Sequence, residues 1–260
     1  LMADALRALR GIPGFLDAAE VQFVETSPAL RDKQAQAVPG ARFHDNIDTL
    51  PSGPLYLIAN EFFDALPIRQ FERAETGWRE RMVGYDDGFT FGLSQAAPFT
   101  PLNDRMDETK PGDVVEICPA IPGMIDVLTR RIETDGGVGL IIDYGDWASL
   151  GDTLQALKSH EVVDPLADPG SADLTAHVDF AAIAEATKCK HTRVTPQGIF
   201  LERLGITARA QSLAAGLNGK ALESHVSAHR RLTHPDEMGN LFKVIGLYPS
   251  NAAPPPGLQS

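Results

Sequence analysis

Acidic and amide side chains follow four apolar runs of the sequence, and their types could bind a nucleotide-like cofactor or a cationic substrate. The runs are residues 21–24, 41–44, 55–59 and 138–142, and the side chains after them are Glu25, Asp45, Asn46, Asn60, Glu61 and Asp143. Ligands of open parallel sheets bind beyond the carboxyl ends of the strands. Turns favour Asp and Asn whatever their function, so for each residue alone a structural role is at least as good an explanation as ligand binding. Four such strand ends together favour a binding site.

Glu25 has the chemistry to hold a ribose. An ionised carboxylate offers two oxygens and can accept hydrogen bonds from both ribose hydroxyls. Ser27 and Pro28, which follow it, are typical of the first turn of a helix. Both S-adenosylmethionine and the nicotinamide cofactors contain a ribose, so this position alone leaves both cofactors open.

The histidines do not form a metal-binding pattern. His177 lies between Asp173 and Asp179 and could accept a proton or anchor a loop, and anchoring is the better supported role. His225 and His229 lie one helical turn apart, but no further ligand accompanies them, so we expect a solvated helix face. The sequence therefore predicts no metal site.

Composition narrows the class of partner. The chain has 260 residues, 43% of them hydrophobic, and a formal net charge of -12 from 35 acidic and 23 basic residues. A surface of this sign repels nucleic acid and suits a cationic substrate or basic protein, although solubility alone would also explain it. No run approaches the length of a membrane span. The two cysteines, Cys118 and Cys189, are expected to be small buried residues without a catalytic role.

The elements that must position these side chains alternate between helix and strand. We expect helices over residues 1–10, 27–36 and 119–133, and strands over 21–25, 41–44, 55–59, 138–143 and 242–247. This alternation predicts an α/β fold. A single catalytic domain is expected over residues 1–250.

Two segments interrupt the alternation. Residues 68–95 alternate apolar and polar side chains around two turn signals, which predicts an antiparallel β insertion. Residues 146–176 form a long polar connection that is predicted to be a lid or substrate loop. Further helices are expected over residues 180–187, 198–217 and 221–232, and the proline-rich tail, 251–260, is expected to be disordered.

Several longer motifs carry a resemblance to a known family. They are FVETSP (residues 23–28), NEFFDALP (60–67), IIDYG (141–145), DPLADPG (164–170), DLTAHVDF (173–180) and MGNLFK (238–243). With them the chain resembles the MidA-like family of S-adenosylmethionine-dependent methyltransferases, which includes a mitochondrial complex I assembly protein arginine methyltransferase. The resemblance extends from Leu1 to about Leu247.

The resemblance implies a Rossmann-like class I methyltransferase sheet with an antiparallel β insertion and extra helices. The family's first strand and glycine-rich loop would precede Leu1, so the N-terminal part is expected to be missing. S-adenosylmethionine is the implied cofactor. The residues implied to bind it are Glu25 at the ribose, Asp45 and Asn46 beside the adenine, Asn60 at the methyl donor, and Ser27 and Asp143 near them.

The resemblance also places the methyl acceptor beside Glu61 and Asp64, with His177 as a further catalytic candidate. Carboxylates can pair with an arginine guanidinium and fix one nitrogen toward the methyl group. An acid at a helix N-terminus is an equally good explanation of Glu61.

The preferred hypothesis is a protein arginine N-methyltransferase that acts on a respiratory complex I subunit and supports complex I assembly. It would work in the bacterial cytoplasm or the mitochondrial matrix. One alternative is an assembly or binding protein that keeps the fold without catalysis. Another is a nicotinamide-dependent dehydrogenase, which Glu25 would also suit, although the motifs resemble none. The sequence does not set the oligomeric state.

Overall fold

The computed structural model describes residues 1–159 and 161–259, which form two compact units, Leu1–Gly53 and the chain from Pro54 onward. The sequence had suggested one domain over residues 1–250. His160, within the predicted loop, and Ser260, at the end of the predicted tail, lie outside the described residues.

The first unit contains a small parallel sheet. Its elements are α1 (Met2–Leu9), α2 (Phe15–Ala18), β1 (Gln22–Val24), α3 (Pro28–Ala37), β2 (Arg42–His44) and the 3-10 helix η1 (Ile47–Thr49). β1 and β2 pair in parallel, and the stacked rings of Phe23 and Phe43 lie 5.5 Å apart. Ser27 caps α3, because its hydroxyl accepts a hydrogen bond from the Leu30 amide at 3.4 Å. The predicted strand–helix–strand order of this region is therefore correct.

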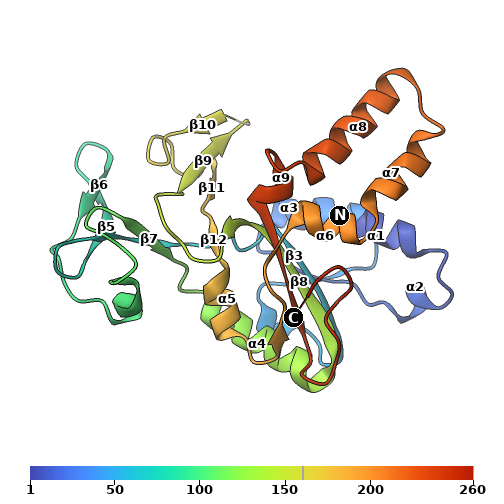
Figure 1. Ribbon diagram of the computed structural model, residues 1–260, viewed down its shortest axis with the longest axis horizontal. Helices are drawn as coiled ribbons and strands as arrows, with labels where there is room; N and C mark the ends of the chain where they lie inside the picture. Colours follow the sequence, from blue (N-terminus) through green and yellow to red (C-terminus); the bar gives the residue numbers. More distant parts are fainter. Residues whose placement is uncertain (160, 260) are drawn as a thin grey trace. The chain divides into compact units, whose positions relative to one another are not determined.

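The second unit is built on a mixed sheet (Figure 1). β3 (Leu55–Asn60) runs parallel to β8 (Gly137–Asp146), and β15 (Phe242–Tyr248) pairs antiparallel with β8. Three two-residue strands extend the sheet, namely β12 (Val178–Asp179) beside the end of β8, and β13 (Lys190–His191) and β14 (Thr195–Pro196) beside β15. The predicted strands form this sheet, but burial of β3 on both faces was wrong, because Tyr56 and Ile58 are 76% and 42% exposed.

Each face of this sheet has its own apolar core. Ile141 and Ile245 belong to a core with side chains of α4 (Ile121–Asp135) and α5 (Phe180–Ala186). Leu140, Ile142 and Val244 point to the other face, where α6 (Gln197–Arg203) contributes Phe200. Successive residues of a strand alternate between faces, so the continuous apolar runs of β8 and β15 serve both cores.

The predicted disorder of the C-terminal tail is wrong for residues 251–259. Leu258 is buried against Phe200 and Val244, and the Arg193 amide donates to the Gln259 carbonyl at 2.8 Å. Burial of this one apolar side chain in the second core orders the tail despite its proline-rich composition.

The segment that was predicted as a β insertion belongs to a separate antiparallel sheet (Figure 1). Its strands are β4 (Arg69–Arg73), β5 (Trp78–Tyr85), β6 (Phe89–Leu93) and β7 (Val114–Ile117), in the order β6-β5-β4-β7. Phe71, Trp78, Leu102 and Val115 form a small core on one face, and Leu102 comes from the 3-10 helix η2 (Thr100–Arg105). The sheet thus extends past residue 95 to include β7.

The connection over residues 146–176 is not a plain loop. It contains β9 (Gln155–Lys158), β10 (Glu161–Val163) and β11 (Asp173–Thr175), which pair antiparallel in the order β10-β9-β11. Each strand has at most four residues, too few for a period-two pattern to emerge from the polar sequence.

The C-terminal helices differ from the prediction in two respects. Gly205, with φ of 83°, separates α6 from α7 (Ile206–Ala214), where one helix had been expected. His225 and His229 do not form a solvated face, because their Nε2 atoms contact the Ala210 carbonyl and the Thr207 hydroxyl and so join α8 (Gly219–Thr233) to α7. The short α9 (Met238–Leu241) then leads into β15. Within the described chain, no helix is long and apolar enough to cross a membrane.

Candidate active site

The first unit places Glu25 at the carboxyl end of β1. Its Oε1 accepts from the Ser27 amide at 2.8 Å, and its Oε2 accepts from Gln34 Nε2 at 3.1 Å. The side chain is half-buried, and each oxygen keeps a second lone pair. These two contacts hold the carboxylate in place beyond the strand while leaving it able to accept hydrogen bonds from a ligand.

Asp45 and Asn46 follow β2 at the same edge of the parallel pair. Asp45 is exposed and accepts from Arg31 Nη2 at 2.6 Å. Asn46 is also exposed and caps η1 by accepting from the Asp48 amide at 3.0 Å. Arg31 also donates to the Glu25 carbonyl at 2.5 Å, which ties the ends of β1 and β2 together. The first unit thus brings together four of the predicted residues, Glu25, Ser27, Asp45 and Asn46.

In the second unit, a tight turn follows β3 at Asn60–Asp64. Glu61 has φ of 50°, the left-handed region that residues other than glycine rarely adopt, and its amide donates to the Ile142 carbonyl at 3.0 Å. Its side chain is exposed, and its Oε1 accepts from Asn60 Nδ2 at 3.2 Å. No helix begins here, so the helix-dipole explanation of Glu61 is wrong. A strained backbone that presents an exposed carboxylate is typical of a functional turn.

Asp143 holds this turn from the end of β8. Its Oδ2 accepts from the amides of Phe62, Phe63 and Asp64 at 3.1, 3.0 and 3.4 Å, and its Oδ1 accepts from the Tyr144 amide at 3.1 Å. The Asp143 side chain has no exposed surface. In this structure Asp143 therefore orients the turn, and direct contact with a cofactor stays a prediction that its burial does not favour.

A second buried carboxylate, Asp64, lies beside Asp143. Only 5% of Asp64 is exposed, and its Oδ1 is buried without a hydrogen-bond partner. Burial raises the pKa of Asp64, while a hydrogen bond from the Tyr144 hydroxyl opposes that rise. Burial, with the added repulsion of Asp64, raises the pKa of Asp143 to about 7. Two carboxyl groups this close disfavour a second negative charge, so the pair retains a proton near neutral pH.

His177 completes the same cluster. Its ring meets the Tyr144 ring edge to face at 5.5 Å, and Tyr144 in turn contacts Phe242 at 5.4 Å. The Ala176 amide, one residue earlier, donates to the Asp64 carbonyl at 3.0 Å. The second unit therefore gathers Asn60, Glu61, Asp64, Asp143 and His177 around the ends of β3 and β8.

A buried glutamate supports His177 from the insertion sheet. Glu116 is 3% exposed and accepts from Gln70 Nε2 at 2.7 Å and from the Thr153 amide at 2.9 Å. The Thr153 hydroxyl donates to Glu116 and accepts from the His177 amide at 2.8 Å. A carboxylate on β7 thus fixes the backbone at His177 through one hydroxyl.

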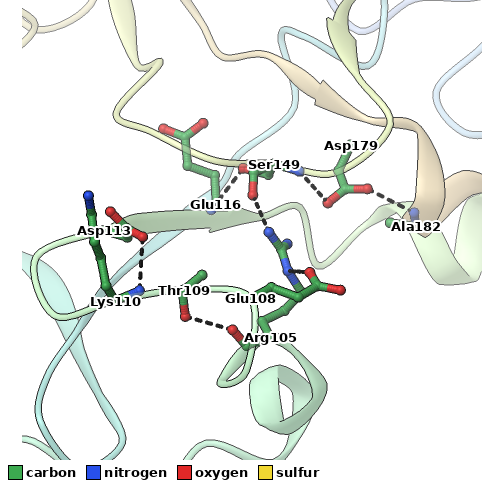
Figure 2. Close-up of polar contacts among 9 residues, drawn as sticks. All are labelled: Arg105, Glu108, Thr109, Lys110, Asp113, Glu116, Ser149, Asp179 and Ala182. Atoms are coloured by element: carbon green, nitrogen blue, oxygen red, sulfur yellow. Dashed lines mark hydrogen bonds and ion pairs between the residues drawn. The ribbon is translucent and has the colours of Figure 1, made fainter.

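Ser149 joins three neighbouring elements beside this glutamate (Figure 2). The Ser149 amide donates to Asp179 Oδ2 at 3.0 Å, and its carbonyl accepts from Arg105 Nη2 at 2.8 Å. Its hydroxyl accepts from the Glu116 amide at 3.1 Å. Asp179 also caps α5 by accepting from the Ala182 amide. These bonds hold the segment after β8 against both the insertion sheet and α5.

The family of the chain follows from comparison with known proteins. A family model described as a putative S-adenosyl-L-methionine-dependent methyltransferase matches residues 1–199, which is most of the chain. The chain belongs to this methyltransferase family. The Xenopus laevis protein named "Protein arginine methyltransferase NDUFAF7, mitochondrial" is 32% identical to it over 284 residues, which cover 96% of this chain and 64% of that protein. The Drosophila melanogaster homologue is 35% identical and is covered to 50% of its length.

Solved structures of family members agree with the fold. A Burkholderia thailandensis protein bound to S-adenosyl-homocysteine superposes with a TM-score of 0.77 and 27% identity, over 97% of this chain and 69% of that one. A second structure from the same organism gives a TM-score of 0.76. The chain therefore has the methyltransferase fold, and it spans about two thirds or less of the curated relatives it matches.

Polar groups that could contact S-adenosylmethionine lie at strand ends in each of the two units. Glu25 keeps free lone pairs for a ribose, and Asp45 and Asn46 are exposed beside it. In the second unit, Asn60 and Glu61 are exposed at the end of β3, and Asp64 keeps one unpartnered oxygen. Taken separately, the exposed groups of each unit have the chemistry to bind polar parts of such a cofactor. No group of three or more metal-binding side chains occurs among the described residues.

Sequence reasoning missed the residues that support the site. Tyr144, Thr153 and Glu116 carry no signal of their own, because their partners lie far away in the chain. Gly145, in the motif around Tyr144, was the one sequence signal that another strand approaches closely there. A Cβ atom there would clash with the Val178 carbonyl, so only glycine lets β12 approach the end of β8.

Proposed function

We propose that this protein transfers a methyl group from S-adenosylmethionine to an arginine side chain of a protein partner, with a respiratory complex I subunit as the substrate. One observation carries the proposal: the strained turn after β3 presents the exposed carboxylate of Glu61 and is held by Asp143. Membership of the methyltransferase family and the names of the NDUFAF7 relatives support it.

Glu25 would fix the cofactor through the ribose hydroxyls, with Asp45 and Asn46 beside the adenine and Ser27 shaping the loop. Ser27 acts through its backbone, because its amide holds one oxygen of Glu25. Asn60 would lie near the methyl donor and orient Glu61, to which its amide group donates.

Glu61 would receive the arginine guanidinium, because it is the exposed acid of the turn. A carboxylate pairs with the guanidinium through two parallel hydrogen bonds and leaves one nitrogen free to react. Asp64 is too buried for this pairing, so we assign it to accept the hydrogen bond of the Tyr144 hydroxyl. His177 packs on Tyr144 and acts as an anchor of the cluster.

The reaction needs little acid–base chemistry. S-adenosylmethionine supplies a methyl group on a sulfonium, and transfer breaks the sulfur–carbon bond, forms a nitrogen–carbon bond and releases one proton from the nitrogen. The chain's own residues would contribute in two ways. Glu61 orients the guanidinium toward the methyl group. Nearby carboxylates stabilise the positive charge of the guanidinium.

The test is a methylation assay with complex I subunits and isotopically labelled S-adenosylmethionine, read by mass spectrometry of arginine-containing peptides. We expect Glu61→Gln to lower kcat by roughly a hundredfold, which is the size of effect for a lost charged contact. Glu223→Gln, an exposed acid on α8, is the matched control and should retain full activity.

The outcomes also separate this function from the alternatives. Equal activity of Glu61→Gln and the control would refute the role of the turn. Partner binding without any methyl transfer would favour an assembly protein that keeps the fold without catalysis. Binding of a nicotinamide cofactor in place of S-adenosylmethionine would overturn the methyltransferase proposal.

The compartment follows from the partner. A mitochondrial complex I subunit would place the protein in the mitochondrial matrix, and the names of the curated relatives describe those proteins as mitochondrial. A bacterial counterpart of complex I would place it in the cytoplasm.

A further inference from the structure

Tyr144 connects segments of the second unit that are far apart in the chain. It lies near the end of β8, and the segment that carries β9, β10 and β11 begins just after it and ends at Thr175. The Tyr144 hydroxyl donates a hydrogen bond to the Asp64 carboxylate and accepts one from the Thr175 hydroxyl. One phenol thus joins the turn after β3 to the returning end of that segment.

The ring and the backbone of Tyr144 are both held in place. The ring meets the His177 ring at 5.5 Å and the Phe242 ring at 5.4 Å, in each case edge to face. The backbone amide donates to Asp143 Oδ1 at 3.1 Å, and the side chain is half-buried. Because aromatic contacts of this kind favour one orientation of the ring, the hydroxyl has a defined position.

Asp64 depends on that hydroxyl. Asp64 is 5% exposed and its Oδ1 has no hydrogen-bond partner, so among the described residues Tyr144 is the only side chain that donates to its carboxyl group. The Asp64 carbonyl accepts from the Ala176 amide at 3.0 Å. The side chain and the backbone of Asp64 are therefore both bonded to the cluster formed by Tyr144 and residues 175–177. Loss of the hydroxyl would leave a buried carboxyl group poorly satisfied, which is unfavourable.

The turn that Asp64 ends needs such support. Glu61, three residues earlier, has φ of 50°. A strained conformation of this kind persists only where the surrounding contacts fix the backbone. Asp143 fixes the turn through the amides of residues 62–64, and Tyr144 fixes its last residue through the Asp64 side chain. The exposed carboxylate of Glu61 therefore depends for its position on two neighbouring residues at the end of β8.

We propose that Tyr144 is a positioning residue for methyl transfer, which holds the Glu61 turn and residues 175–177 in one fixed arrangement. The inference rests on the proposed function, in which Glu61 receives the arginine. Tyr144 acts through Asp64 and needs no contact with the cofactor. Loss of its hydroxyl lets the turn relax and misplaces Glu61, which slows the reaction but leaves cofactor binding by Glu25 unchanged.

Tyr144→Phe tests the role in the reaction, because it removes the hydroxyl and keeps the ring. We expect kcat to fall roughly tenfold, while the KM for S-adenosylmethionine stays within about twofold. Tyr85→Phe is the matched control and should keep full activity, because Tyr85 is 74% exposed on the insertion sheet. Thr175→Val should lower kcat several-fold, and Thr175→Ser should behave like the natural protein, because serine retains the hydroxyl that donates to Tyr144.

Amide hydrogen exchange tests the positioning without relying on methyl transfer. In Tyr144→Phe, exchange should become several-fold faster at residues 61–64 and 175–177 and stay unchanged elsewhere in the chain. Unchanged exchange at these residues, or a rise throughout the chain, would overturn the inference. So would an active natural protein whose kcat is the same in Tyr144→Phe and in the control. A natural protein that methylates no arginine would instead overturn the proposed function, whatever the exchange at the turn.

Discussion

Two acids that follow strands of the sequence play different roles in the two units. Glu25, after β1, is held by groups two and nine residues away and remains half-buried with free lone pairs. Asp143, at the end of β8, is held by amides 79 to 81 residues away and has no exposed surface. The same sequence pattern therefore yields a group with lone pairs available to a ligand where its partners are local, and a structural group where its partners come from a distant turn.

The largest expected effect comes from removing the structural acid. Asp143→Ala leaves the amides of Phe62, Phe63 and Asp64 buried without an acceptor. We expect the free energy of unfolding to fall by roughly 3 kcal/mol, since each unsatisfied buried donor is costly, and methyl transfer to be lost. Urea denaturation measures the first effect. Asp143→Asn keeps one carbonyl oxygen and should lose less, and equal losses in the two variants would contradict this role.

Glu25 should show the opposite balance, with a large effect on cofactor binding and a small effect on stability. Glu25→Ala should weaken S-adenosylmethionine binding by roughly 10–100-fold, the range for hydrogen bonds to a charged group, while stability changes little. Calorimetric titration gives the affinity. Asp32→Ala, an exposed acid on α3, is the control. A loss of stability comparable to that of Asp143→Ala would remove the distinction between the two acids.

The coupling of Asp64 and Asp143 predicts a pH dependence. Folding raises the pKa of Asp143 from 3.8 to about 7, so the folded state binds the proton more tightly than the unfolded state. Stability from this group is therefore fully present below the unfolded pKa of 3.8 and is lost as pH rises from there to about 7. Asp64→Asn removes the repulsive charge, which lowers the pKa of Asp143 and should move this loss to lower pH. Urea unfolding between about pH 3.5 and 8, at about half-unit intervals, measures the shift, and an unchanged profile would contradict the coupling.

The smallest expected effect concerns the support behind His177. Thr153→Val keeps the shape of the side chain but removes the hydroxyl between Glu116 and the His177 amide. We expect a loss of about 1–2 kcal/mol in the free energy of unfolding and a several-fold lower kcat with little change in KM. Thr153→Ser retains the hydroxyl and should behave like the natural protein. If both variants lose kcat equally, the hydroxyl does not position His177.

Much of the fold could be predicted because its signals are local. The Ser27 cap, the apolar runs of β3, β8 and β15 and the helix α4 each depend on residues within a few positions of one another. The short strands β9, β10 and β11 and the packed tail were missed for the opposite reason. Leu258 is buried only because Phe200 and Val244 form its pocket.

The sequence by itself determined the α/β layering, the family motifs and the placement of acids after the strands, since these depend on periodicity and on neighbouring residues. Only the tertiary structure decided which acids remain available to a ligand. Asp143 and Glu61 both follow apolar runs, yet one meets three amides of a distant turn and the other stays exposed on that turn. Burial and hydrogen bonding depend on contacts across the fold, and these contacts separate the residues that hold the turn from those that stay exposed on it.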